Sequence, residues 1–552
     1  MKKRSGPVKK PVLSERGAIV KKGRSLIRTA LVYPNTYRAG MSSLGFQTVY
    51  RLGNQLDNAA FERVFLPDRT TNSGRLKSIE TGLDLDRFDI ILFSISFEND
   101  FIHLVQLLEH AGIPLRSSDR NHIHPLVAAG GVACFLNPEP IADFMDCFLL
   151  GEAECFLENF FNAFAAEPSR KKFLETLEGR VPGAYVPKAH PSSKIPKIQV
   201  QYLDSLENIT TSSAIITHDT AFKDTFLIET LKGCPHGCRF CSAGFIYRPP
   251  RIYPEENICK AIDMAKGLTD KIGFVSSAIA DHPQMNEICD YGLKHNFRLS
   301  FASLRADRLT DKFIQALAMS RIKTATIAPE AGSERMRRII NKKIEEHHIL
   351  SAAHKLVSAG IINLKLYFMI GLPFETPEDI QSIILLTLKI KSVFLEASKK
   401  NRRIGTITLS INPFIPKPCT PFQWAPMADE KYLKNALKTI RHGLKKTANI
   451  KINTESIKKA KIHALLSRGG RQTADIIESA LHKGWARAIK ENMEYCNTII
   501  YTQRHLDTPL PWDFLDNRVK KQFLKKEFLR AQQAKKSPSC PMISCTKCQT
   551  CM

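Results

Sequence analysis

The chain has 552 residues, 43% of them hydrophobic, so it is long enough for several buried cores and is not a disordered protein. It contains no apolar run of about 18 residues and no apolar secretory segment behind its basic N-terminus, which argues against a membrane-spanning or secreted protein and favours a cytoplasmic one. The net charge of +26 is regional: residues 1–28 carry ten Lys/Arg against one acidic residue, and residues 431–552 carry 25 against nine. Basic ends of this kind suit RNA phosphates or a ribonucleoprotein, although a solvated basic surface has the same composition.

The first 165 residues predict a basic flexible tail, residues 1–25, followed by a doubly wound, Rossmann-like α/β domain, residues 26–165. Short apolar runs of the kind that form strands buried on both faces alternate there with helix-like stretches. The runs are "LIRTALVY" (26–33), "FERVFLP" (61–67), "FDIILFSISF" (88–97), "HPLVAAGG" (124–131) and "DCFLLGE" (146–152). In such a sheet the ligand lies beyond the carboxyl ends of the strands.

A second alternation predicts a partial parallel (β/α)6 barrel over residues 221–430, after a proline-containing connector at 166–220. Six strand-like runs begin near residues 225, 271, 298, 324, 363 and 404, with helix-like stretches between them. A barrel of this kind places its chemistry at the carboxyl ends of the strands. Residues 431–535 predict a basic helical region, and residues 536–552 form a cysteine-rich tail.

Three cysteines follow the first strand of this second alternation. Cys234, Cys238 and Cys241 form CxxxCxxC in the loop "KGCPHGCRFC". A closed zinc site uses four protein ligands and a disulfide uses two, whereas three thiolates can hold three irons of a cubane cluster and leave the fourth iron open. A zinc knuckle remains the alternative.

This loop, with Phe240 just before the third cysteine, resembles the radical S-adenosylmethionine (SAM) superfamily. The resemblance implies a [4Fe–4S] cluster on Cys234, Cys238 and Cys241 whose open iron binds the amino and carboxylate groups of SAM. It implies one-electron cleavage of SAM to methionine and a 5′-deoxyadenosyl radical. It also implies a one-electron reductase, such as a flavodoxin or ferredoxin, as a partner.

Three further stretches look like SAM-binding features of that superfamily: "SLRADRL", "TIAPEAGSERMRRIINK" and "FMIGLPFET". Barrel-internal ion pairs are the alternative role for their polar side chains, and no catalytic residue is assigned. The SAM contacts that the resemblance implies are Ser303, Arg305, Glu330, Gly332, Ser333, Arg335, Gly371 and Pro373.

The first domain resembles the cobalamin-binding domain that precedes the barrel in a class of radical SAM enzymes. The matching stretches are "PNTYRAGMSSLGFQTVY", "FDIILFSISFEND" and "VAAGGVACFLNPEPIADFMDCFLLGEAE", with Gly130, Gly131, Gly151 and Glu152 as implied cobalamin contacts. The loop after the first strand has no Asp-x-His-x-x-Gly, so the resemblance implies cobalt without a histidine ligand from this chain. A domain that holds no corrin is the alternative.

The tail carries Cys540, Cys545, Cys548 and Cys551 in the order C-x4-C-x2-C-x2-C. Four thiolates at this spacing suit zinc or an auxiliary iron–sulfur cluster, and spacing alone does not choose between them. An unliganded tail is the alternative.

These features predict a radical SAM enzyme that transfers a methyl group with the help of cobalamin, on a substrate related to RNA. Two alternatives remain open at this point. One is an enzyme similar to the radical SAM methylthiotransferases, and the other is an RNA-binding or assembly factor whose iron–sulfur clusters are structural.

Overall fold

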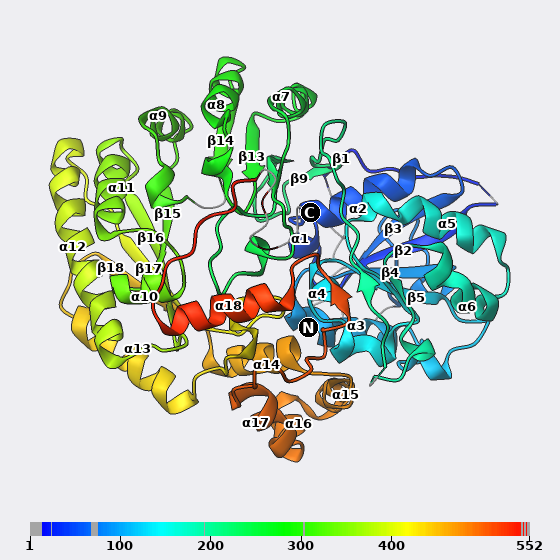
Figure 1. The fold of residues 1–552 in the computed structure, drawn as a ribbon. Helices are drawn as coiled ribbons and strands as arrows, with labels where there is room; N and C mark the ends of the chain where they lie inside the picture. Colours follow the sequence, from blue (N-terminus) through cyan, green and yellow to red (C-terminus); the bar gives the residue numbers. More distant parts are fainter. Residues whose placement is uncertain are drawn as a thin grey trace, which may run out of the picture.

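The computed structural model describes residues 14–23, 25–67, 75–192, 194–301, 304–542, 545 and 548, without the side chains of 400 and 401. Two β/α halves lie side by side, and C-terminal helices pack below and between them (Figure 1). Within the described ranges, none of the helices combines the length and the apolar character that a bilayer crossing requires.

The first half is a six-stranded sheet in the order β3-β2-β4-β5-β6-β7, and the strand-like runs of the sequence form its five parallel strands, as predicted. These strands are β2 (Ile27–Tyr33), β3 (Ala59–Phe65), β4 (Ile90–Ser94), β5 (Leu126–Gly130) and β6 (Cys147–Leu149). The helices of this half are α1 (Tyr37–Gly40), α2 (Leu44–Gln55), α3 (Phe101–His110), α4 (Val132–Leu136), α5 (Leu157–Ala166) and α6 (Arg170–Arg180).

This domain extends beyond residue 165, into the stretch predicted as a connector. Helix α6 buries Phe173 and Leu177, and Phe173 packs edge-on against Phe160 of α5. Strand β7 (Ala184–Tyr185) then pairs antiparallel with β6. Helix α6 buries only two side chains among charged ones, so its apolar stripe is weak. The sequence pattern therefore does not show that α6 belongs to this domain.

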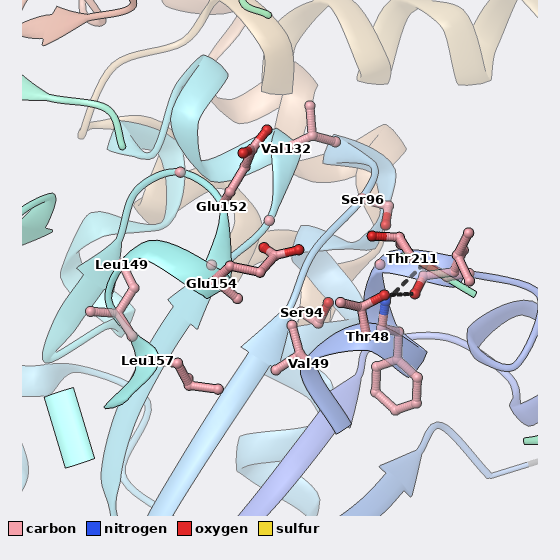
Figure 2. A pocket seen from close by; sticks show the side chains of 18 of the residues that line it. Thr48, Val49, Ser94, Ser96, Val132, Leu149, Glu152, Glu154, Leu157 and Thr211 are labelled. Atoms are coloured by element: carbon pink, nitrogen blue, oxygen red, sulfur yellow. Dashed lines mark hydrogen bonds between the residues drawn. The ribbon is translucent and has the colours of Figure 1, made fainter. Parts of the chain in front are cut away.

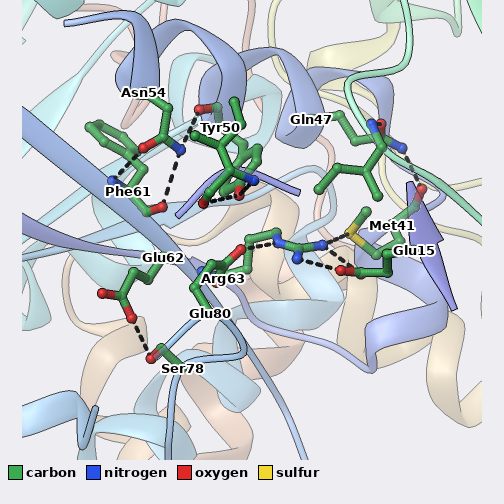
Figure 3. Close-up of polar contacts among 12 residues, drawn as sticks. Glu15, Met41, Gln47, Tyr50, Asn54, Phe61, Glu62, Arg63, Ser78 and Glu80 are labelled. Atoms are coloured by element: carbon green, nitrogen blue, oxygen red, sulfur yellow. Dashed lines mark hydrogen bonds and ion pairs between the residues drawn. The ribbon is translucent and has the colours of Figure 1, made fainter. Parts of the chain in front are cut away.

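Part of the stretch predicted as a flexible tail is held in place. Strand β1 (Glu15–Arg16) pairs with β9 (Ile216–Thr217), and Glu15 forms a 2.8 Å ion pair with the buried guanidinium of Arg63. Figure 3 shows Arg63 bonded on its other side to Glu80, at 2.6 Å. The buried guanidinium of Arg63 therefore holds Glu15, and with it β1, against the first half of the protein.

The second half contains the six predicted parallel strands. Strands β10 (Phe226–Glu229), β13 (Lys271–Val275) and β14 (Arg298–Phe301) form one sheet, and β15 (Thr324–Glu330), β16 (Asn363–Ile370) and β17 (Ile407–Pro413) belong to the next. A parallel bridge between Leu304 and Ile327 joins the two. The outer helices are α7 (Glu255–Met264), α8 (Met285–Lys294), α9 (Asp311–Met319), α10 (Glu334–Ile339), α11 (Glu346–Ser358) and α12 (Pro377–Asn401).

The region from residue 431 is helical, as predicted, but it also adds strands. Strand β18 (Ile450–Thr454) pairs parallel with β17 as a seventh barrel strand, and β19 (Leu515–Asp516) pairs with β8 (Ile198–Gln199). The helices here are α13 (Glu430–Leu444), α14 (Ile457–Arg468), α15 (Thr473–Lys483), α16 (Trp485–Glu491), α17 (Met493–Tyr501) and α18 (Lys521–Gln532).

One hydrophobic core joins the two halves. It contains Phe93 of the first sheet, Phe245 and Met336 of the barrel, Leu466 of α14 and Phe528 of α18. Because close-packed side chains permit little sliding, the carboxyl ends of the two sets of strands are held at a fixed distance across the interface.

Candidate functional site

The loop that carries Cys234, Cys238 and Cys241 follows β11 (Leu231–Lys232) and leads to β12 (Arg251–Ile252). Its conformation is fixed by hydrogen bonds to the end of α10. The backbone N–H of Arg239 donates to the Ile340 carbonyl (3.0 Å), and the Asn341 side chain donates to the Gly237 carbonyl (2.9 Å). The loop is thus preformed by the protein.

The three thiols suit a cluster better than a single ion. Burial, together with the thiols of Cys238 and Cys241, raises the pKa of Cys234 to about 12, and burial together with Cys238 raises the pKa of Cys241 to about 11. A metal therefore displaces protons when it binds. Among the described residues, no three His, Cys, Asp or Glu side chains lie close enough to hold one metal ion. Three thiolates in one loop match three separate irons of one cluster.

Two of the predicted SAM contacts lie beside this loop, each in an ion pair. Arg305 bonds to Asp307 at 3.0 Å, and Glu330 bonds to Lys342 at 3.1 Å. The charge of Arg305 lowers the pKa of Cys234, and that of Glu330 raises the pKa of Cys241, beside the larger effects of burial. Both charges therefore act on thiols of the loop, and the contact of Arg305 and Glu330 with SAM stays a prediction. Ser303 and, in the cysteine-rich tail, Cys551 lie outside the described residues.

Three other predicted contacts lie between α10 and the start of α12, one through close packing and two through bonds. A Cβ on Gly332 would lie 2.2 Å from the backbone nitrogen of Ile383, so close packing of α12 explains this glycine. Ser333 donates to Asp379 (2.5 Å), and Arg335 pairs with the same carboxylate. Their hydrogen-bonding groups are engaged within the protein, and their contact with SAM stays a prediction.

The turn that contains Gly371 and Pro373 holds a residue that the sequence analysis does not single out. Gly371, with φ at +75°, donates its N–H to Glu375 (2.6 Å), and the Tyr432 hydroxyl donates to the same oxygen (2.8 Å). Burial raises the pKa of Glu375 to about 7, despite these two donors. Only the fold reveals this, because the burial depends on the packing of helix α13, which carries Tyr432.

A cavity of about 330 Å³ lies where the carboxyl ends of the two halves face each other. Glu152, Glu154 and Ser94 line it from the first sheet, and Thr48 and Val49 from α2 (Figure 2). The barrel contributes Glu229, Lys232, Tyr247 and Val275. None of the described residues that line it is a histidine.

The predicted cobalamin contacts Gly130, Gly131, Gly151 and Glu152 all line this cavity, but two glycines have another reason to be glycine. A Cβ would lie 2.5 Å from the Ile95 carbonyl oxygen at Gly131 and 2.1 Å from the Gln201 carbonyl oxygen at Gly151. Gly45 differs, because no heavy atom lies within 4 Å of the position that its Cβ would occupy. Gly45 therefore leaves room that a larger side chain would fill.

Charged groups meet at the barrel side of the cavity. The Lys232 ammonium lies 3.3 Å from Glu229 and 3.9 Å from Glu154. Burial lowers the pKa of Lys232, but these carboxylates outweigh it and hold the pKa well above its ordinary value. Next to it, Arg251 binds Glu152 through two hydrogen bonds of 2.9 and 2.6 Å. The wall thus keeps a permanent cation beside the cavity.

Comparison with known proteins gives two family matches and one relative that is similar over most of its length. The model described as radical SAM proteins, N-terminal, matches residues 45–187, and the radical SAM superfamily model matches residues 228–387. The uncharacterized protein MJ0966 of Methanocaldococcus jannaschii is 31% identical over 456 residues, which cover 81% of this chain and 90% of that protein.

Two solved structures match this chain. The radical S-adenosylmethionine methyltransferase TsrM of Kitasatospora setae, solved with cobalamin and a [4Fe-4S] cluster bound, matches with a TM-score of 0.50 at 11% identity, over 85% of this chain and 99% of that one. The cobalamin-dependent S-adenosylmethionine radical enzyme OxsB matches with a TM-score of 0.45 at 16% identity, over 68% of this chain and 56% of that one. At such identities the TsrM match shows a shared fold.

The protonation of Glu375 gives a test of the site's geometry. A carboxyl group with a raised pKa stabilises the folded protein fully below the unfolded value, and this stability is lost as pH rises through about 7. Glu375→Gln keeps the accepting oxygen and removes the titration. We therefore expect the urea midpoint of the variant to rise relative to wild type between about pH 5 and about pH 8.

The matched control is Glu396→Gln, an exposed position on α12. A midpoint difference for Glu375→Gln that does not change with pH, or that falls, would contradict the burial of this carboxyl group.

Proposed function

The chain belongs to the radical SAM superfamily, and we propose that it is a cobalamin-assisted enzyme of that superfamily, which transfers a methyl group to an unactivated position of its substrate. The observation that carries the proposal is the cavity between the halves, because residues from both sets of strand ends line it. Ligands of doubly wound sheets and of β/α barrels bind at these ends. A molecule held there would contact both halves at once.

The two cofactors would supply different chemistry and would be held by different residues. When bound, the cluster and SAM supply one-electron cleavage to methionine and a 5′-deoxyadenosyl radical, and cobalamin supplies a carrier for the methyl group. Cys234, Cys238 and Cys241 would hold the cluster, and the rim of Gly45, Gly130 and Glu152 would hold the corrin.

The chain's own residues would position the ligands and exclude water. Leu31, Leu92 and Leu149 give the cavity an apolar floor, which favours a large organic ligand over solvent. Lys232 places a positive charge at the barrel wall, while Arg305 and Glu330 offer charges of both signs beside the cysteine loop. A zwitterionic amino acid group such as that of SAM matches this pair of charges. An electron donor of the flavodoxin or ferredoxin class in the cytoplasm would complete the system.

The radical chemistry is tested by SAM cleavage under anaerobic conditions. We expect the reconstituted protein with dithionite to form 5′-deoxyadenosine, detected by mass spectrometry, and the Cys234→Ala/Cys238→Ala/Cys241→Ala variant to form none, because it lacks the thiolates. Iron-loaded protein that fails to bind SAM would overturn the proposal. A Cys259→Ser variant, which removes a thiol from α7, controls for the loss of cysteine as such.

The corrin assignment is tested at Gly45. Gly45→Phe should fill the open space at the cavity rim, so that less cobalamin co-elutes with the protein on gel filtration, as read from its visible absorbance. Gly179→Phe is the matched control, since Gly179 is also an exposed helical glycine with no atom near its Cβ position. Equal cobalamin retention by the two variants would remove this cavity as the corrin site.

We further propose that the substrate is RNA or is carried by RNA. A groove of about 690 Å³ beside β18 is lined by Lys434, Lys438, Arg441, Lys445 and Lys458, with Glu430 and Glu455 as its acidic residues. The first three lie on the exposed side of α13, whose opposite side packs in the core, and Lys445 follows at the end of this helix. A concave surface with an excess of cations suits a phosphate backbone.

The RNA proposal predicts salt-dependent binding. Lys438→Glu/Lys445→Glu/Lys458→Glu should weaken binding of a fluorescein-labelled single-stranded RNA and reduce the slope of log K against log salt by about 0.7 for each phosphate that the protein no longer neutralises. The control is Lys171→Glu/Lys172→Glu/Lys188→Glu, at exposed lysines of the first domain. RNA affinities that fall equally in both variants would reflect net charge alone and refute a role for the groove.

A further inference from the structure

Two arginines meet where the end of α14 contacts the segment that follows α17 (Figure 1). Arg468 is the last residue of α14, and its side chain is fully buried. Its guanidinium donates to the carbonyls of Ile500 (2.9 Å) and Thr502 (3.0 Å), at the end of α17. The Arg504 guanidinium in turn donates to the carbonyl of Arg468 (2.6 Å). The backbone of this junction thus holds both guanidinium groups.

Three N–H groups at the junction are buried without an acceptor in the described part of the chain. Two of them are Nε of Arg468 and Nη1 of Arg504. The third is the indole N–H of Trp424, whose carbonyl accepts from the backbone N–H of Arg504 (2.9 Å). Because a buried donor without an acceptor costs free energy, these groups indicate a ligand that accepts hydrogen bonds.

The charges at the junction are also uncompensated. Burial, together with the charge of Arg504, lowers the pKa of Arg468 to about 9. Burial likewise lowers the pKa of Arg504 to about 10, although Tyr495 and Asp513 act in the opposite direction. Asp513 is itself paired with Lys521 at 2.5 Å. Since a buried charge is stable only when it is paired, an anion at this junction would supply the missing compensation.

The other fully buried arginines of the described chain differ from Arg468 in their charged neighbours. Arg63 and Arg239 each form an ion pair with a carboxylate. Arg337 bonds to carbonyl groups, as Arg468 does, but nearby glutamates raise its pKa against the effect of burial. The charged group that acts on Arg468 is a second cation. Arg468 is therefore the arginine in this group for which an external anion is expected.

Helix α15 begins at the same place and adds positive potential. Gly469 and Gly470 lead from Arg468 into this helix of 11 residues, and its N-cap residue Gln472 makes no side-chain capping bond. The Gly470 N–H donates to the Tyr495 hydroxyl (3.2 Å), which fixes the turn. Because the N-terminus of a helix carries a partial positive charge, it favours an anion beside the two arginines.

We propose that Arg468 and Arg504, at the start of α15, form a binding site for a phosphate group. Guanidinium groups and helix N-termini are the donors that recognise phosphate in proteins. Arg504 is half-buried, so the ligand enters from solvent on its side, whereas Arg468 is covered and admits only a small anionic group. The same donors suit free phosphate or the phosphate of a nucleotide. The site uses neither the cluster nor cobalamin, so the inference is independent of the proposed function.

The test is isothermal titration calorimetry of the full chain, in chloride buffer of constant ionic strength, with inorganic phosphate and with adenosine 5′-monophosphate (AMP). We expect wild type to bind about one phosphate per chain. Arg504→Gln should bind it at least about tenfold more weakly, because a charge-assisted hydrogen bond is lost. AMP that binds as tightly as inorganic phosphate, or more tightly, would assign the site to a nucleotide. Weaker binding of AMP would assign it to free phosphate.

Matched variants separate this site from general charge effects. Arg487→Gln removes the same charge from an exposed position on α16 and should bind phosphate as wild type does. The groove variant Lys438→Glu/Lys445→Glu/Lys458→Glu should also retain this binding. Arg504→Lys keeps the charge without the planar donor group, so its affinity should lie between those of wild type and Arg504→Gln. Circular dichroism of each variant verifies that it is folded.

Three outcomes would overturn the proposal. These are wild type that binds neither inorganic phosphate nor AMP, affinities that fall equally in Arg504→Gln and Arg487→Gln, and phosphate binding that is lost in the groove variant instead. Cluster assembly and SAM cleavage are measured separately, so failure here is distinct from failure of the radical SAM assignment.

Discussion

Beside the shared hydrophobic core, a buried ion pair between Glu152 and Arg251 joins the two halves at the cavity. The pair is bidentate and charge-assisted, and Leu203 closes the contact by donating to Glu152 and accepting from Arg251. Removing one partner of a buried pair typically costs about 3–5 kcal/mol, because the other charge is left uncompensated. Glu152 follows β6 and Arg251 follows the cysteine loop, so the pair joins the two walls of the cavity.

Polar contacts of Arg239 also support the other side of the cysteine loop. Arg239 is bonded to the α10 end, to α18 and to the tail, and the α10 end is far from the other two in sequence. The loop conformation therefore depends on the C-terminal segment from α18 onward as well as on the barrel. A chain that lacked α18 would leave a buried guanidinium without its carboxylate, and the cysteine positions would lose their support.

Much of the fold is predictable from sequence because parallel strands buried on both faces leave continuous apolar runs. Strands β4 and β5 are of this kind. Strand β18 is not, because Lys451 and Asn453 are exposed on the sheet edge and break the run. The order of residues 14–23 also escapes sequence reasoning, since it depends on an ion pair from Glu15 to Arg63, which is 48 positions away.

The candidate site likewise contains residues that the sequence identifies and residues whose roles only the fold explains. Spacing alone identifies Cys234, Cys238 and Cys241, because the ligands of one cluster lie in one loop. The roles of Gly45, Glu375 and Gly332 depend on what packs beside them, which no local pattern contains. Gly332 illustrates this, since its lack of a side chain is required by the backbone of α12, at Ser382 and Ile383.

Metal loading is coupled to the fold around the loop. The thiols of Cys234 and Cys241 have raised pKa values, so assembly of the cluster releases protons and is opposed by acid. The backbone, in contrast, is already held by Asn341 and Arg239, so little conformational entropy is lost when metal binds. The protein thus uses folding energy to preform the loop before metal binds.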